Sequence, residues 1–253
     1  MTHPENPSTE YILEKLETLK KTYKMNEEAR LRNAGKTTLI IVGPSGTGKT
    51  TLTDEVIRLR PDIEPIATRT TRDRRREGVD KNPDPATFTT ADEGFTHIKA
   101  LEFAEQGEFV NFSNFGQHVY STKPEDFPNF SIGPITADSV PYILNGGFDR
   151  SAVIFPVVEK HLFRHVLEEE RLTFKDISYR LKEGIESTSF AADSVNEPWF
   201  HAVENSHEDG ALQRSAENII AIGEGGGTRL DPALAKQAIL AMRDVLIDLK
   251  EAA

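Results

Sequence analysis

The sequence predicts an α/β protein in which a parallel sheet carries helices on both of its faces. Three observations lead to this prediction. An apolar run at Leu39–Val42 is followed by a glycine-rich loop and then by apolar residues at helical spacing. Two further apolar runs, 131–137 and 152–158, have the length of buried strands. Helical segments separate the runs, and strands that alternate with helices are typical of a doubly wound parallel sheet.

The glycine-rich loop spans residues 43–50 and has the sequence GPSGTGKT. It matches the phosphate-binding pattern G-x-x-x-x-G-K-[ST] in full, with a strand before it and a helix after it. Its glycines let backbone N–H groups converge on phosphate oxygens at a helix N-terminus. We expect Lys49 to reach the β- and γ-phosphates of ATP and Thr50 to bind Mg²⁺. The alternative is a glycine-rich turn that binds no ligand, but such a turn would need neither Lys49 nor Thr50.

Composition limits the remaining functions. The chain has 253 residues and no cysteine, and the absence of cysteine excludes disulfides and thiolate metal sites. Its net charge of −11 argues against nucleic acid as the main partner. No apolar run approaches the roughly 20 residues of a membrane span. The N-terminus lacks the layout of a secretory signal, so we expect no membrane association and a cytoplasmic location. Residues 69–76 are an exception in this acidic chain, because five of them are arginine.

The N-terminal region comes first in chain order. Residues 1–9 are rich in polar residues and proline and are expected to be a tail. A helix is predicted from Ser8 or Thr9 to about residue 32, since apolar side chains recur near helical spacing at Ile12, Leu16, Leu19 and Tyr23. This apolar stripe needs a partner, either the core or another subunit, which leaves a homodimer open.

The middle of the chain alternates short strands with polar segments. The helix after the glycine loop is expected to stop at Pro61, and a short strand is predicted at Ile63–Ala67. Proline, asparagine and aspartate predict a loop over 79–87. Residues 90–107 have a helical pattern that Gly107 closes, and residues 108–116 alternate as a strand does before the polar segment 117–122.

The C-terminal part is predicted to be mainly helical. Asp138 follows the strand at 131–137, and helical patterns cover 159–192 and 210–222, with a short strand at 202–205 between them. A glycine-rich joint at 223–227 precedes a last helix from Asp231 to Leu249, in which Asp231 is the expected cap and proline follows it.

These residues resemble the guanylate kinase family over roughly 37–222. GPSGxGK is that family's form of the phosphate-binding loop, and Thr70-Thr71-Arg72-x-x-Arg75 matches its TTRxxR segment. The resemblance implies a P-loop NTPase-type sheet with a small nucleotide-binding β-rich insertion, a helical lid and added helices at both ends. It also implies that Arg72 and Arg75 hold the phosphate of a nucleoside monophosphate. The other acceptor residues would be Thr68, Asn111, Tyr120, Thr122 and Asp138.

The resemblance places ATP on the glycine loop and on Asn205, which resembles an asparagine near the adenine. The loop residues concerned are Gly43, Pro44, Ser45, Gly46, Thr47, Gly48, Lys49, Thr50 and Thr51. Arg164, Arg171 and Arg180 would act with Lys49 from the lid, and Asp138 would help to hold Mg²⁺, through water. The implied divisions are 1–35, the kinase-like region 36–222 (insertion about 68–125, lid about 159–185), and 223–253.

Three departures from the family pattern keep the substrate open. Asn111 stands where the family has a guanine-reading glutamate, Ala86 where it has a tyrosine, and Thr136 where it has a second acid. The first expectation is ATP-dependent phosphorylation of GMP or dGMP. The alternatives are a kinase of the same fold for another nucleotide or a ribose phosphate, and a non-catalytic module that binds peptides. Arg74 and Arg76 are expected to be solvated surface charges, and His118 is expected to be structural.

Overall fold

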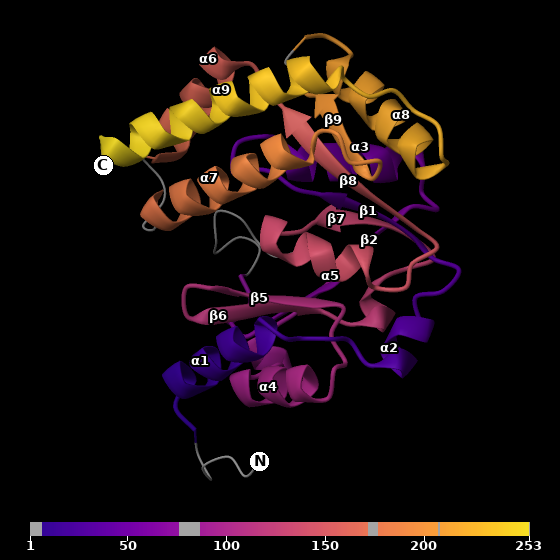
Figure 1. Ribbon diagram of the computed structural model, residues 1–253, viewed down its shortest axis with the longest axis vertical. Coiled ribbons are helices and arrows are strands. Elements are labelled where there is room, and N and C mark those ends of the chain that lie inside the picture. The colour runs from indigo at the N-terminus through magenta and orange to yellow at the C-terminus, as the bar shows by residue number, and fades with distance from the viewer. Residues whose placement is uncertain (1–6, 76–86, 172–176, 207, 253) are drawn as a thin grey trace. The chain divides into compact units, whose positions relative to one another are not determined.

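Figure 1 shows the computed structural model, which describes residues 7–75, 87–171, 177–206 and 208–252. The chain divides into two compact units. The P-loop unit consists of Thr37–Glu64, Phe130–Val140 and Arg150–Ala253. The small-sheet unit consists of Met1–Lys36, Pro65–Asn129 and Pro141–Asp149. We describe each unit by itself.

A five-stranded sheet forms the centre of the P-loop unit, with strand order β2-β7-β1-β8-β9. β1 pairs in parallel with β7 and with β8, and β8 pairs in parallel with β9. In this register Leu39 lies beside Ile132 on one side and Ala152 on the other. The strands are β1 (Thr37–Ile41), β2 (Glu64–Pro65), β7 (Phe130–Pro134), β8 (Arg150–Val157) and β9 (Phe200–Glu204). This arrangement confirms the predicted parallel sheet.

Both faces of that sheet are buried. Leu39 and Ile41 belong to a core that includes residues of α3 (Lys49–Leu59) and α8 (Ala211–Gly223). Ile40 points to the opposite face because side chains alternate along a strand, and it is also fully buried. The remaining helices of the unit are α6 (Lys160–Arg171), α7 (Ile177–Ser194) and α9 (Pro232–Glu251), and α9 packs on α6, α7 and β8.

The small-sheet unit contains a four-stranded sheet with order β4-β3-β6-β5. Its hairpin, β5 and β6, is antiparallel, and β6 pairs in the same way with β3. The strands are β3 (Thr68–Thr70), β4 (Phe88–Thr89), β5 (Asn111–Phe115) and β6 (His118–Thr122). The helices are α1 (Thr9–Lys20), α2 (Glu27–Leu31), α4 (His97–Glu105) and α5 (Val140–Leu144), of which α5 starts in the P-loop unit.

The apolar stripes of both terminal helices are buried within the chain. Ile12 and Leu16 of α1 are 2% and 0% exposed, in a core shared with α4 and the β5–β6 hairpin. Ile239 and Met242 of α9 are fully buried. Each helix starts at a predicted cap, since Ser8 accepts a hydrogen bond from the Tyr11 N–H and Asp231 accepts from the N–H groups of the second and third residues after it.

Several predicted elements were wrong in extent. The single helix expected over 90–107 is a short 3₁₀ turn followed by α4, because Gly94 adopts a left-handed conformation with φ of 92° and Thr96 then caps a new helix. The N-terminal helix ends at Lys20, and Asn26 caps the separate α2. Only two residues of the strand expected at 63–67 pair in the sheet. The loop expected over 79–87 lies outside the described residues except for its last residue, and Ala86 is therefore not described. Arg76 and part of the expected lid also lie outside the described residues.

A buried ion pair ties β3 to the segment after β6. The Arg69 guanidinium donates two hydrogen bonds of 2.7 Å to the Asp126 carboxylate, which is 7% exposed and also accepts from the Lys123 N–H. Removal of one partner leaves the other charge buried, which costs about 3 kcal/mol.

Asp126→Asn is therefore expected to lower the free energy of unfolding in urea by about 3 kcal/mol. Glu27→Gln is the control, since it loses an exposed pair worth about 0.5 kcal/mol; equal losses would contradict the prediction.

Candidate active site

The glycine loop of the P-loop unit has the backbone that its sequence requires. Gly46 and Gly48 have φ values of 79° and 76°, which favour glycine. A Cβ atom at Gly48 would lie only 2.6 Å from the Asn205 side-chain nitrogen, so a side chain here would displace Asn205 from the loop. The loop opens directly into α3, whose first residues are Lys49, Thr50 and Thr51, the last two exposed.

Lys49 lies across the loop. Its ammonium donates hydrogen bonds to the carbonyl oxygens of Gly43 at 2.5 Å and Pro44 at 2.7 Å. The Thr47 hydroxyl donates to the same Pro44 carbonyl at 2.9 Å. The cation is thus held at the opening of α3, where the helix dipole also favours an anion.

Two predicted residues from distant parts of the sequence reach this loop. Asn205, the residue after β9, donates from its side-chain amide to the Thr47 carbonyl at 2.9 Å. Arg180 of α7 donates to the Ser45 hydroxyl at 2.9 Å. The other two arginines are placed differently: Arg164 forms an ion pair of 2.6 Å with Asp248 of α9, and Arg171 ends α6 with a side chain outside the described residues.

Asp138 follows the carboxyl end of β7, the strand that pairs with β1. It belongs to a 3₁₀ turn, Ala137–Ser139, and its carboxylate is exposed. The hydroxyl groups of Thr136 and Ser139 both donate to Oδ1 of Asp138. Because ligands bind beyond the carboxyl ends of parallel strands, Asp138 and the glycine loop occupy the end of the sheet where a ligand is expected.

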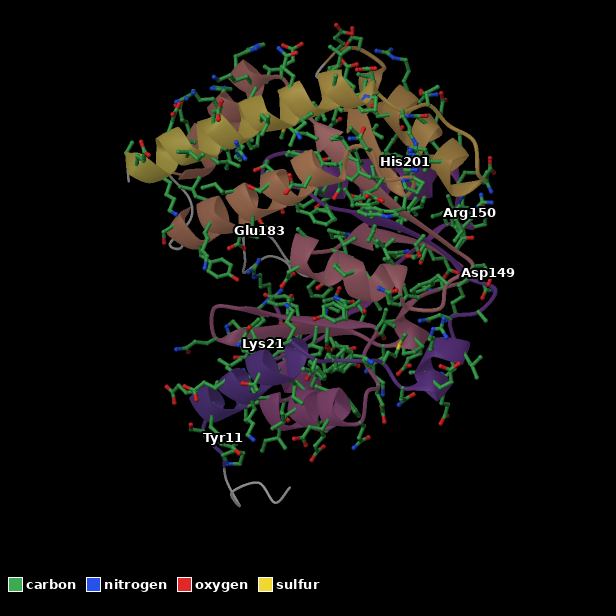
Figure 2. All side chains as sticks on the ribbon, in the orientation of Figure 1. Tyr11, Lys21, Asp149, Arg150, Glu183 and His201 are labelled. Carbon is green, nitrogen blue, oxygen red and sulfur yellow. The ribbon has the colours of Figure 1, made fainter. Side chains whose placement is uncertain are left out.

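Sequence reasoning missed Glu183, a partly buried carboxylate of α7 (Figure 2). The Ser187 hydroxyl donates to its Oε1 at 3.0 Å. Burial raises the pKa of Glu183, and the nearby Asp138 and Glu186 act in the same direction, whereas Lys49 opposes them. A usable signal was present, since Glu183 follows Arg180 by three residues and therefore lies on the same side of the helix.

A second group of predicted residues gathers on the small sheet. Thr71 fixes the end of β3 against β6, because its N–H donates to the Val119 carbonyl and its hydroxyl accepts from the Val119 N–H. Arg72 follows, 9% exposed, with its Nε donating to the Tyr120 hydroxyl at 3.0 Å. Thr68 lies in β3 beside Phe88, and Arg75 is exposed. The hydrogen bond to Tyr120 therefore fixes the orientation of the Arg72 guanidinium group.

The β5–β6 hairpin has one apolar and one polar face. Phe112 and Val119 enter the core of the unit. On the other face Asn111 is opposite Thr122, and Ser113 is opposite Tyr120. Asn111 is 5% exposed, and its side-chain carbonyl accepts a hydrogen bond from the Thr122 hydroxyl. The predicted acceptor residues of the hairpin thus lie together on its polar face.

The remaining candidates have structural surroundings. Arg74 pairs with Glu93 at 2.7 Å and donates to the Phe88 carbonyl. Burial lowers the pKa of His118, and it lowers that of His201, labelled in Figure 2, to about 4, so both imidazoles are neutral at pH 7. Within the described ranges, three or more histidine, aspartate or glutamate side chains never cluster as a metal site would need, and no helix there has the length and hydropathy to span a membrane.

The sequence of this chain is similar to those of known guanylate kinases. Residues 35–144 match the family model described as guanylate kinase. A guanylate kinase of Myxococcus xanthus (strain DK1622) is 35% identical over 88 residues, which cover 33% of this chain. Over these residues the chain is similar to guanylate kinases. The matched segment spans only 36% of the Myxococcus protein, about a third of its length.

A solved guanylate kinase supports the fold over a longer range. The crystal structure of the enzyme from Anaplasma phagocytophilum superposes with a TM-score of 0.50 and 15% identity, over 75% of this chain and 85% of that one. The residues that match the family model include the glycine loop, Arg72 and Arg75, the β5–β6 hairpin and Asp138. Arg180, Glu183 and Asn205 lie outside it, so their assignment depends on the contacts described above.

Proposed function

We propose that this protein is a guanylate kinase-like enzyme that transfers the γ-phosphoryl group of ATP to a nucleoside monophosphate, with GMP or dGMP as the first candidate. The observation that carries the proposal is the complete glycine loop with Lys49 held across it at the start of α3. An acceptor phosphate oxygen attacks the γ-phosphorus, the bond to the β–γ bridging oxygen breaks, and ADP leaves. Such transfer depends mainly on positioning and on neutralising charge.

The P-loop unit would bind the donor. Lys49 would contact the β- and γ-phosphates, and the loop N–H groups would cradle them. Hydroxyl and carboxylate oxygens suit Mg²⁺, so the exposed Thr50 and Asp138 fit this ion, Asp138 through water. The ion would supply positive charge that offsets the negative charge developing during transfer. Asn205 would lie near the adenine of ATP while its side chain keeps its hydrogen bond to the Thr47 carbonyl.

The small-sheet unit would bind the acceptor. Arg72 and Arg75 would clamp its phosphate with bidentate contacts, with Tyr120 and Thr122 as further partners. Asn111 would face the base from the polar side of the hairpin. Arg180, which donates to Ser45, would act from the lid on the transferring group. Arg171 and Arg164 would act with it, and Arg164 would have to leave its partner Asp248 to do so.

A second candidate acceptor class follows from the Asn111 side chain. Its carbonyl oxygen accepts from Thr122, which leaves the amide N–H₂ as the group to meet a base. A carboxylate in this place would accept from two N–H groups of guanine, whereas an N–H₂ group pairs with an acceptor. The observation favours a kinase for another phosphorylated acceptor as runner-up. The intact Lys49 and Thr50 disfavour a module that only binds peptides.

The test is an ADP-release assay with Mg-ATP and GMP, dGMP, AMP, CMP, UMP, dTMP or ribose 5-phosphate. We expect turnover of GMP, and we expect Asn111→Glu to raise kcat/KM for GMP about tenfold, the value of one added hydrogen bond to a charged group. Turnover of a different acceptor alone would favour the runner-up. ADP release no faster than that of Lys49→Ala with every acceptor would overturn the proposal.

A further inference from the structure

One face of α7 lies against the glycine loop. Glu183, Gly184 and Ser187 follow Arg180 by three, four and seven residues, so all four share a side of the helix. Arg180 bonds to Ser45, and a Cβ atom at Gly184 would lie 3.2 Å from the Cβ of Pro44. α7 therefore contacts the loop from two of these four positions.

The same helix also contacts the 3₁₀ turn that carries Asp138. Glu183 has Lys49 and Asp138 as electrostatic neighbours, so its carboxylate lies at the end of the sheet where the donor phosphates are proposed to bind. A partly buried carboxylate is costly in free energy unless it is paired or binds a cation. The hydrogen bond from Ser187 fixes one of its oxygens and thereby its orientation.

We propose that Glu183 is a second carboxylate of the Mg-ATP site and holds the metal ion together with Thr50 and Asp138. This inference rests on the proposed function. Mg²⁺ in nucleotide sites is bound by one or two carboxylates along with the substrate phosphates, and outer contacts through water are usual because the ion keeps several waters. Without a metal ion, a carboxylate beside the triphosphate would repel it, so Glu183 makes the site selective for the metal complex.

An alternative role for Glu183 is to orient Lys49. The two roles predict different dependences on the metal. If Glu183 acts on Lys49, its loss weakens the binding of ATP with or without Mg²⁺, because Lys49 contacts the phosphates in both cases. If Glu183 acts on the metal, its loss weakens the binding of Mg-ATP and leaves metal-free ATP bound equally well or better.

The test is calorimetric titration of the full chain with a non-hydrolysable ATP analogue, in Mg²⁺ and in EDTA. We compare wild type, Glu183→Gln and the matched control Glu186→Gln, whose exposed carboxylate pairs with Lys182 on the same helix. For Glu183→Gln the dissociation constant in Mg²⁺ is expected to rise about tenfold or more, as for other partners of a metal site, with no rise in EDTA. Glu186→Gln is expected to match wild type.

Two results would overturn the inference: an equal loss of affinity in Mg²⁺ and EDTA, or wild-type affinities in both. Circular dichroism melts establish that Glu183→Gln is folded before it is titrated. The inference and the proposed function fail in different ways. If wild type binds the analogue and phosphorylates a monophosphate while Glu183→Gln titrates like wild type, only the inference is wrong. If wild type binds no nucleotide, the proposed function is wrong and the inference with it.

Discussion

Lys49→Ala is expected to reduce kcat for ADP formation by about 10³-fold, the range seen when a preorganised donor to a developing charge is removed. The ammonium of Lys49 is already fixed by the Gly43 and Pro44 carbonyls, so it needs no rearrangement of the loop to meet a γ-phosphate. Its removal would leave the transferring group without this fixed cation. Steady-state assays with saturating ATP and acceptor measure the change.

The control for this prediction is Lys182→Ala. Lys182 is an exposed lysine of α7 whose partner is Glu186, so its loss changes the net charge by the same amount without touching the loop. We expect this variant to keep its wild-type rate. A Lys49→Ala enzyme that retains more than a tenth of the wild-type kcat would show that transfer does not depend on this cation.

Arg72→Lys is expected to lower kcat/KM for the monophosphate by about 10²-fold while the KM for ATP stays unchanged. Arg72 is 9% exposed, and Tyr120 accepts from its Nε, which holds the planar fork in a fixed orientation for two parallel bonds to a phosphate. Lysine keeps the charge but offers a point donor on a flexible stem. The loss therefore reports geometry rather than net charge.

The sequence offers a matched control for Arg72→Lys two residues further on. Arg74→Lys removes a guanidinium that is paired with Glu93 and bonded to the Phe88 carbonyl. Initial rates at varied monophosphate are expected to show little change for this variant. If both substitutions lower kcat/KM equally, the effect comes from distortion of the arginine segment, and the clamp role of Arg72 is wrong.

The predictable parts of this molecule are those with local causes. The glycine loop could be recognised because strand, turn and helix are consecutive in the sequence, and the caps at Ser8 and Asp231 because capping acts within three residues. The helix expected over 90–107 failed for an equally local reason that was overlooked: Gly94 interrupts a pattern that apolar spacing alone continues.

The parts that escaped prediction depend on tertiary contacts. The bond from Thr122 to Asn111 needs the register of the hairpin, which decides what the asparagine presents to a base. The spacing from Arg180 places Glu183 on the same side of α7, but only the packing of α7 against the glycine loop and the Asp138 turn shows that this side meets a phosphate site. Arg164 has an exposed partner on α9 that no spacing rule indicates.

The burial of α9 also constrains how the chain is made. Met242 and Val245 are fully buried, and the helix packs on α6, α7 and β8, which are all synthesised before it. During translation the P-loop unit must therefore wait, with an apolar surface uncovered, until residues 232–251 have left the ribosome. We therefore expect chains truncated within α9 to leave this apolar surface exposed and to be prone to aggregation.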